Sequence, residues 1–451
     1  MSKPMILGGG DDAFLQRPLA EMSKDDLARL FLEAAKPDTQ WYIGLEIEIF
    51  PYWQDSLRPV EHEQLAGVLA RLGKLAGMTE THEPNGALTG LKGNGELISL
   101  EPGGQLEFAS RPHRALKALR QEALEYAAHL KEAGAPLGIG YWAAGFQPLA
   151  TRDSVPVMPK PRYEHMRRYL GPRGRRALDM MHLTGSVQCT VDFQSEKNLA
   201  DKVRTAARVS PFFSALVAAS PFSGGQLNGY KTVRYQTWLE VDDERCGIWP
   251  EMVDEEGLTV GRYIDRTLSV APMFFIRDGE YLAAGPEPYS WYIEHGFQGG
   301  PVTVGDYLDH LTTFFPEIRP KGYVELRGAD CVLPEEAVAV GGFWRGILDH
   351  EPTRQAVDER LSMMDWGAIR ALQPKVAVEG LDAMSPAGKV RDVIKWVVQA
   401  GYDRLAKSSP DCAECVVPLV ERAHRGRSPA DEMLEIAAKS GVAAALEIVK
   451  L

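Results

Sequence analysis

The fold is decided by residues 43–50, which read Ile-Gly-Leu-Glu-Ile-Glu-Ile-Phe and alternate strictly between polar and apolar side chains. Because side chains of a strand point to its two faces in turn, Glu46 and Glu48 share one face and Ile47 lies on the other. Taken alone, this pattern fits an ordinary half-buried strand whose carboxylates lie in water. It gains meaning because two other segments repeat it.

The first repetition, residues 97–108, places Glu101 and Glu107 on either side of a Pro-Gly-Gly turn. The second, residues 323–327, alternates so that Glu325 and Arg327 share a face. Three strand-like segments with paired acidic, or acidic and basic, residues predict a sheet lined with oxygen ligands. Such a surface suits a hard cation such as Mg²⁺ together with nucleotide phosphates.

The composition is typical of a soluble globular protein, with 451 residues of which 45% are hydrophobic and 25% charged. The formal charge of -12 argues against nonspecific binding of nucleic acid. No apolar run approaches the roughly 18 residues that cross a bilayer, and residues 1–12 hold no apolar signal-peptide segment. We therefore expect a cytoplasmic protein, monomer or homodimer, that binds small molecules and neither nucleic acid nor membrane.

The cysteines do not indicate a disulfide framework. There are five, at positions 189, 246, 331, 412 and 415, which is an odd and sparse set for a chain of this length. Cys412 and Cys415 form a lone Cys-x-x-Cys with no second pair at zinc spacing, which favours a structural role.

Helix and strand signals follow one another in no regular βαβ order, which predicts an α+β fold and not a doubly wound sheet. Residues 1–20 have the character of a flexible leader, and 21–451 form a single domain with a helical C-terminal part at 334–451. Ser23 begins a capping box. Helices are predicted from there to about residue 35 and over 61–77, 113–134, 196–219 and 305–315, strands over 137–146 and 185–193, and loops over 250–300.

The most basic stretch of this acidic chain is 147–176, which includes Lys160 and Arg162. Two interpretations stay open. The stretch is either a solvated loop and helix face or a surface that meets a triphosphate or a carboxylate substrate.

Several motifs, in this order, resemble the glutamate–cysteine ligase family in its plant and proteobacterial branch, over about residues 23–446. They are Ile-Gly-x-Glu-x-Glu-x-Phe at 43–50, Ser-Leu-Glu-Pro-Gly-Gly-Gln-x-Glu at 99–107, Gly-Phe-Gln-Pro at 145–148, Met-Pro-Lys-x-Arg-Tyr-Glu-x-Met at 158–166, Leu-Asp-Met-Met at 178–181, Phe-Phe-Pro-Glu-Ile-Arg at 314–319 and Glu-Leu-Arg-Gly-Ala-Asp at 325–330. One motif is weak evidence, but the ordered set is specific.

The resemblance implies a glutamine-synthetase-like carboxylate–amine ligase domain, with an antiparallel sheet bent around a funnel and helices outside it. Enzymes of that family use ATP to phosphorylate the γ-carboxylate of glutamate, and an amine then displaces the phosphate. In the named family the product is γ-glutamylcysteine, an intermediate of glutathione biosynthesis. ATP is then a co-substrate, and Mg²⁺ or Mn²⁺ is the expected metal.

The resemblance also assigns roles to individual residues. The expected metal ligands are Glu46, Glu48, Glu101, Glu107, Gln188 and Glu325, because phosphoryl transfer needs carboxylates that hold cations against the phosphates. The expected nucleotide-binding residues are Lys160, Arg162 and Arg327, of which Arg327 also acts on the transferring phosphoryl group.

Arg234 is the second expected catalytic residue and anchors a substrate carboxylate, since a guanidinium fork binds two oxygens. The other expected substrate residues are Trp238, Met181 and Thr184. Plainer roles remain open: a solvated pair for Glu325 and Arg327, a surface position for Arg234, and core packing for Trp238.

Two departures from the family pattern bear on function. The family usually reads Gly-Thr-Glu-His-Glu-Lys-Phe at the first strand, where this chain has Ile47 and Ile49 on the face away from the carboxylates. After residues 178–181 the family has Leu-Arg-Thr-Cys, whereas this chain has His182, Leu183, Thr184 and Gly185. The missing arginine leaves open whether the acceptor is cysteine or another amine. It also leaves open whether the acyl donor is glutamate or an analogue of it. The missing cysteine removes the plant-type regulatory disulfide.

Two rival functions fit the sequence less well. A glycoside hydrolase would use two of these glutamates as acid and base, but five acidic positions with two arginines fit a metal–nucleotide site better. A non-catalytic relative is disfavoured because clustered carboxylates repel one another unless a cation is present.

Overall fold

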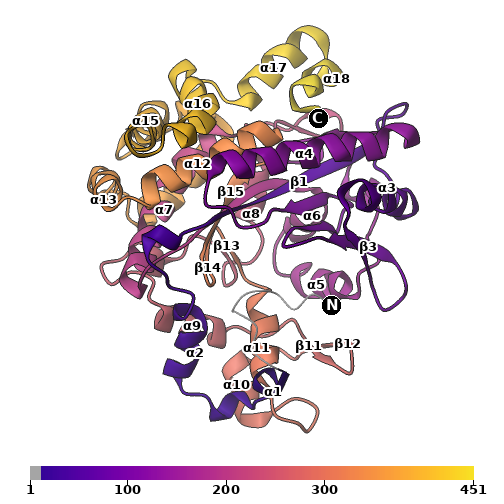
Figure 1. Cartoon of the computed structure of the whole chain (residues 1–451), viewed down its shortest axis with the longest axis vertical. Helices are drawn as coiled ribbons and strands as arrows, with labels where there is room; N and C mark the ends of the chain where they lie inside the picture. The colour runs from indigo at the N-terminus through magenta and orange to yellow at the C-terminus, as the bar shows by residue number, and fades with distance from the viewer. Residues whose placement is uncertain (1–11) are drawn as a thin grey trace.

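The strand that carries Glu46 and Glu48, β1 (Ile43–Trp53), lies in the middle of an antiparallel sheet in the computed structural model (Figure 1). The structure describes residues 12–451, and among them the sheet has nine strands in the order β14-β15-β7-β1-β5-β4-β3-β2, with β6 paired to the second half of β1. These strands are β2 (Thr79–His82), β3 (Leu88–Lys92), β4 (Leu97–Leu100), β5 (Leu106–Ala109), β6 (Ile139–Trp142), β7 (Ser186–Val191), β14 (Ile318–Pro320) and β15 (Val324–Asp330).

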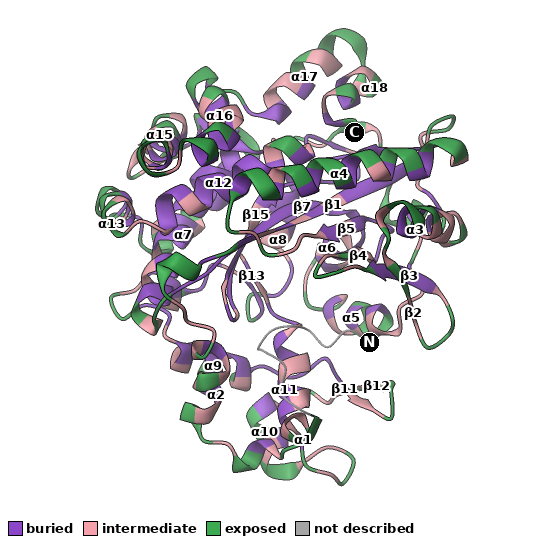
Figure 2. Cartoon of the chain, in the orientation of Figure 1, coloured by how far each residue is buried: buried purple, intermediate pink, exposed green. Residues whose placement is uncertain are grey.

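The apolar face of β1 forms the core of the molecule. Ile43, Leu45, Ile47 and Ile49 are at most 2% exposed, and each such side chain contributes about 1.5–3 kcal/mol by leaving water. Helix α12 (Pro334–Leu348) packs on this face, where a Cβ on Gly341 would lie 3.1 Å from Cδ1 of Ile43. The glycine therefore lets the helix approach the sheet closely, and Figure 2 shows the buried residues gathered along β1, β7, β15 and α12.

Further helices surround α12 and the sheet. Helices α4 and α12 lie along the sheet. Helices α15 and α16 pack against α12, above and to the left of it in Figure 1. The helices before α12 are α1 (Asp12–Leu15), α2 (Lys24–Leu32), α3 (His62–Ala76), α4 (Leu116–Gly134), α5 (Pro161–Leu170), α6 (Ala177–Leu183), α7 (Glu196–Leu216), α8 (Val233–Trp238), α9 (Val260–Ser269), α10 (Tyr289–His295) and α11 (Val304–Leu311). Those after it are α13 (Glu351–Arg360), α14 (Trp366–Glu379), α15 (Val390–Ser408), α16 (Pro410–Arg425), α17 (Pro429–Ser440) and α18 (Val442–Ala445).

The predicted α+β fold is confirmed, and most predicted helices and strands appear within a few residues. The capping box at Ser23 is present, with Asp26 as its partner at the start of α2. No helix among residues 12–451 is long and apolar enough to cross a membrane.

Two predictions differ from the structure. Residues 250–300 were expected to be loops but contain α9, α10 and a hairpin of β11 (Phe274–Arg277) and β12 (Glu280–Ala283), whose short elements gave no long periodic signal. Residues 1–11 of the expected leader lie outside the described residues. Residues 12–20 include α1, and the backbone N–H of Leu19 donates to the carbonyl of Val302. Leu19 is buried, so this part of the leader packs onto the domain.

Candidate functional site

Strand register places the acidic residues next to one another on the polar face of the sheet. Glu48 lies directly opposite Glu107 on β5, and Glu46 lies opposite Gln188 on β7. Glu101, at the start of the turn between β4 and β5, shares the hydroxyl of Ser99 with Glu107, at 3.2 Å and 3.4 Å. All four carboxylates are half-buried. The face predicted from the alternation therefore exists.

This acidic cluster, Glu46, Glu48, Glu101 and Glu107, has excess negative charge. Burial and the neighbouring Glu101 raise the pKa of Glu48 to about 7. Burial and the same neighbour raise the pKa of Glu107 well above its ordinary value, while Lys160 acts in the opposite direction. Like charges directly opposite each other in a sheet are destabilising, so the cluster is a good place for a cation.

The donors fit a divalent metal by their chemistry, since Mg²⁺ prefers carboxylate oxygens. Among residues 12–451, however, no three His, Cys, Asp or Glu side chains converge into a ready coordination sphere. These two observations agree for Mg²⁺, which usually takes one or two protein carboxylates and completes its sphere with water and substrate phosphates.

Glu325, expected as a metal ligand, has a different role in the structure. Its side chain is fully buried, and its two oxygens accept from Arg319 at 2.5 Å, Lys321 at 2.7 Å and Arg327 at 3.1 Å. Burial alone would raise the pKa of Glu325, but these three cations hold it well below its ordinary value. We therefore reassign Glu325 from metal ligand to the counter-ion of a cationic cluster, which consists of Arg319, Lys321 and Arg327.

Sequence reasoning missed two members of that cationic cluster, Arg319 and Lys321. A usable signal was present, because the two residues are spaced by two, as on one strand face, and immediately precede β15. The cluster adjoins the acidic one, since Arg319, Lys321 and Arg327 all act to lower the pKa of Glu46. Acidic and basic surfaces thus meet across β7.

Gln188, also expected as a metal ligand, connects the two clusters. Its side-chain carbonyl accepts a hydrogen bond from Arg327, and its amide nitrogen lies 3.4 Å from Glu48 and 3.1 Å from the hydroxyl of Ser186. Gln188 therefore helps to orient both groups, and its role as a metal ligand stays a prediction.

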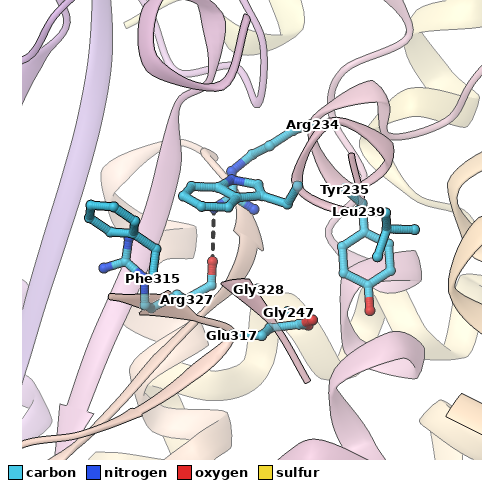
Figure 3. Close-up of a pocket in the computed structure, with 9 residues that line it drawn as sticks. Arg234, Tyr235, Leu239, Gly247, Phe315, Glu317, Arg327 and Gly328 are labelled. Atoms are coloured by element: carbon cyan, nitrogen blue, oxygen red, sulfur yellow. Dashed lines mark hydrogen bonds between the residues drawn. The ribbon is translucent and has the colours of Figure 1, made fainter. Parts of the chain in front are cut away.

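Arg234, Trp238 and Arg327 line a small cavity (Figure 3). Arg234 is buried on α8 and donates from Nη2 to the carbonyl of Arg327 at 2.8 Å. The guanidinium of Arg327 lies 5.9 Å from the centre of the Trp238 ring. Among residues 12–451, neither Nε of Arg234 nor Nε1 of Trp238 has a hydrogen-bond partner, and both atoms are buried. Glu317 completes the wall and was given no role by sequence reasoning.

Met181 and Thr184, expected to bind substrate, are not part of this cavity. Met181 is 3% exposed and belongs to the main core. The Thr184 hydroxyl donates to the carbonyl of Met180, and the Thr184 carbonyl accepts from Gln105 at 2.9 Å. These bonds tie the end of α6 to the turn that carries Glu101, so we reassign both residues to packing beneath the site.

The basic stretch divides into two parts. Lys160 lies near the acidic cluster, since its charge lowers the pKa of Glu107. Its ammonium is 5.3 Å from the centre of the Tyr163 ring. Arg162 donates to the carbonyl of Thr312 at 3.1 Å. Arg175 and Arg176 instead pair with Glu240, and the side chain of Arg175 is exposed, which fits the solvated interpretation.

His182 is buried just after this stretch, and it makes the fold acid-sensitive. Burial, with the nearby Arg167, lowers the pKa of His182 to about 4. In the unfolded chain this histidine has a pKa of about 6.5. Between pH 6.5 and pH 4 the unfolded chain therefore binds a proton at His182, and the folded chain does not. Stability therefore falls as pH drops from about 6.5 to about 4, by about 3 kcal/mol at most.

We predict that His182→Leu removes this part of the acid sensitivity. Thermal unfolding is measured at pH 7.5 and pH 5, and the midpoint of the variant should fall less between the two than that of the original chain. The exposed His424→Leu is the control and should behave like the original. Equal falls in His182→Leu and the original chain would show that His182 does not titrate on unfolding.

The comparison with known families decides the identity of the site. Residues 42–447 match the profile of glutamate-cysteine ligase family 2 (GCS2). The chain belongs to this family. It is therefore an ATP-dependent ligase, as the resemblance predicted.

Individual relatives agree with the family assignment. The chain is 35% identical to glutamate–cysteine ligase B of Oryza sativa subsp. japonica over 395 residues, which covers 86% of this chain and 78% of that protein. It is 34% identical to the glutamate–cysteine ligase of Nicotiana tabacum over 424 residues, covering 92% of this chain and 80% of that one.

Solved structures support the fold. The glutamate–cysteine ligase of Francisella tularensis, in complex with AMP, has a TM-score of 0.54 at 12% identity and covers 91% of this ligase and 87% of that chain. The bifunctional glutathione synthetase of Pasteurella multocida has a TM-score of 0.50 at 11% identity, covering 91% of this ligase and 52% of that chain. At these identities the likeness concerns the fold alone.

The predicted cytoplasmic location is wrong by the same comparison. The relatives from Oryza sativa and Nicotiana tabacum are named chloroplastic enzymes. The sequence argument failed because the lack of an apolar segment speaks only against a secretory signal peptide. Organelle transit peptides are amphipathic and rich in arginine and serine, and they need no such segment.

The cysteines of the ligase are not arranged for a redox switch. All five are buried and unpaired in the structure of residues 12–451. At Gly185, where the family pattern has a cysteine, a Cβ would lie 2.7 Å from the carbonyl oxygen of Ala144, so no side chain fits. Burial raises the pKa of Cys415, which disfavours the reactive thiolate.

We predict that dithiothreitol changes the activity of the ligase by less than about twofold. Phosphate release is measured with and without the reductant at saturating ATP. A several-fold response that disappears in Cys415→Ser would show that the Cys412/Cys415 pair regulates the enzyme.

Proposed function

We propose that this chain joins glutamate to cysteine, with ATP hydrolysed to ADP and phosphate, and so forms γ-glutamylcysteine. The observation that carries the proposal is the acidic cluster with its excess charge, next to the cationic cluster around Glu325. Magnesium and the nucleotide phosphates suit the first surface, and a phosphoryl group in transfer suits the second. The curated relatives named glutamate–cysteine ligases support this choice of substrates.

In the proposed reaction a γ-carboxylate oxygen of glutamate attacks the γ-phosphorus of ATP, and ADP leaves. The amine nitrogen then attacks the acyl carbon, phosphate leaves with the bonding electrons, and the nitrogen loses a proton. Arg327 would bind the transferring phosphoryl group, because it is the member of the cationic cluster that bonds to Gln188, whose amide lies 3.4 Å from Glu48 of the acidic cluster. Arg234 and Trp238 would hold the amino-acid substrate, since each has a donor without a partner among residues 12–451.

We propose Mg²⁺, or Mn²⁺ in its place, as the metal of the acidic cluster, with one or two of Glu46, Glu48, Glu101 and Glu107 as ligands of any one ion. When bound, it supplies positive charge to the phosphate oxygens of ATP. Lys160 and Arg162 would contact the nucleotide from the side of α5. The oligomeric state, monomer or homodimer, stays a prediction.

A second candidate is the same chemistry with another amine, or with a glutamate analogue. The observation in its favour is Leu183, which lies where the family pattern has an arginine. It is 4% exposed and packs in an apolar cluster with Phe146, Ala150, Val155 and Val233. Val233 directly precedes Arg234, so the lost cation changes the surroundings of the substrate-binding helix.

The test is phosphate release from ATP with magnesium and glutamate, run against a panel of amines that includes cysteine. If cysteine alone gives turnover, the first candidate stands and the change at Leu183 is compensated elsewhere. If cysteine is poor and another amine works, the second candidate replaces it. Hydrolysis of a glycoside without ATP would overturn both and favour the two-glutamate hydrolase.

A further inference from the structure

Glu317 belongs to the wall of the Arg234 cavity, yet neither of the two charged clusters uses it. It lies between β13 (Phe315–Pro316) and β14, in a loop segment that the sequence motif at 314–319 includes. Its side chain is half-buried and lines the cavity together with Arg234 and Arg327 (Figure 3).

Two buried side chains from two separate helices hold the carboxylate of Glu317. Ser210 of α7 donates to one oxygen, and the amide nitrogen of Gln373, on α14, lies 3.4 Å from the other. The same amide nitrogen lies 3.2 Å from the hydroxyl of Tyr235, on α8, which also lines the cavity. These donors satisfy the carboxylate and fix its orientation, because a carboxylate taken out of water without partners is costly.

Glu317 is also linked to both arginines of the cavity. Its main-chain carbonyl accepts from the N–H of Arg327 at 3.0 Å, and the carbonyl of Arg327 in turn accepts from Arg234 at 2.8 Å. Burial raises the pKa of Glu317, and among charged groups Arg234 lowers it most.

The backbone next to Arg327 is shaped around the same carboxylate. Strand β15 changes register between Leu326 and Ala329, which is where Gly328 lies. A Cβ on Gly328 would come 2.6 Å from an oxygen of Glu317 and 2.9 Å from the hydroxyl of Ser210. The irregular strand therefore leaves room for Glu317 beside Arg327.

We propose that Glu317 is a positioning residue that orients Arg234 for the amino-acid substrate. The inference rests on the proposed function, in which Arg234 binds the carboxylate of that substrate. Glu317 acts on the substrate through the guanidinium of Arg234. Loss of its charge should therefore weaken binding of glutamate and leave binding of ATP unchanged.

The test separates the KM values of the two substrates in Glu317→Gln, which keeps the shape of the side chain. We expect the KM for glutamate to rise about tenfold, while the KM for ATP stays within about twofold and the thermal midpoint is close to that of the original chain. Glu317→Asp should recover part of the loss. The matched control is Asp306→Asn, since Asp306 is a buried carboxylate of α11 that pairs with Arg277 of β11 and does not line the cavity.

Arg234→Lys distinguishes failure of this inference from failure of the proposed function. If Arg234→Lys raises the KM for glutamate and Glu317→Gln does not, the positioning role is wrong and the proposed function stands. If Arg234→Lys leaves that KM unchanged, the assigned role of Arg234 fails first.

Ser210→Ala decides the question if Glu317→Gln fails to fold, since it removes one holding hydroxyl without changing charge. A higher KM for glutamate at unchanged KM for ATP would support the inference. An unchanged KM for both substrates would overturn it.

Discussion

Glu107→Gln reduces ATP turnover by at least about a thousandfold, which corresponds to about 4 kcal/mol of lost transition-state stabilisation. Glu107 lies directly opposite Glu48 and shares a hydroxyl with Glu101, so it is central to the acidic cluster. The amide keeps the shape of the side chain and removes one charge from the proposed cation site. The weakened attraction for the metal then reduces the charge that faces the phosphates.

The same substitution should leave the metal-free protein folded, with a thermal midpoint equal to or above that of the original chain. The reason is that Gln relieves the repulsion between carboxylates that face each other across two strands. Turnover is measured as phosphate release over a range of magnesium concentrations. Glu125→Gln, at an exposed position of α4, is the control and should be fully active. Near-normal turnover in Glu107→Gln would remove Glu107 from the proposed set of ligands.

Arg327→Lys is expected to lower kcat by about a hundredfold to a thousandfold, with a much smaller change in the KM for ATP. Arg327 bonds to Gln188 and to Glu325, which lies 3.1 Å away, and its main chain supports Arg234. A lysine keeps the charge but has no planar fork, so it cannot keep both side-chain bonds and also reach a phosphoryl oxygen.

A matched control for this prediction is Arg208→Lys. Arg208, on α7, pairs with Asp358 and has a side chain 13% exposed, against 12% for Arg327. Its replacement should alter stability slightly and kcat by less than about twofold. Equal losses of kcat in the two variants would mean that Arg327→Lys acts through the fold. An unchanged kcat in Arg327→Lys would contradict contact with the transferring group.

The polar face of the central sheet could be predicted because it depends on local periodicity. Alternation at residues 43–50 put Glu46 and Glu48 on one face, and the turn at 101–105 placed Glu107 opposite Ser99 of β4. That Glu107 also faces Glu48 comes from the pairing of β5 with β1, which is distant in sequence. The apolar partner face follows from the same rule, since Ile47 and Ile49 are fully buried.

The identity of charge partners could not be predicted in the same way. Glu325 was assigned to the metal from its alternation with Arg327, but the hairpin of β14 and β15 brings Arg319 directly opposite it. Met181 and Thr184 were assigned to the substrate from motif position alone. The end of α6 turns both of them into packing and backbone contacts.

By itself, the sequence determined the fold class, the acidic strand face and the ligase family, because these depend on periodicity and on an ordered set of motifs. Only the tertiary structure decided which carboxylates lack cations and which are neutralised, since that balance depends on pairs distant in sequence, such as Gln188 with Arg327. It also placed Glu317 in the wall of the same cavity as Arg234, held by donors from two helices that no local pattern connects.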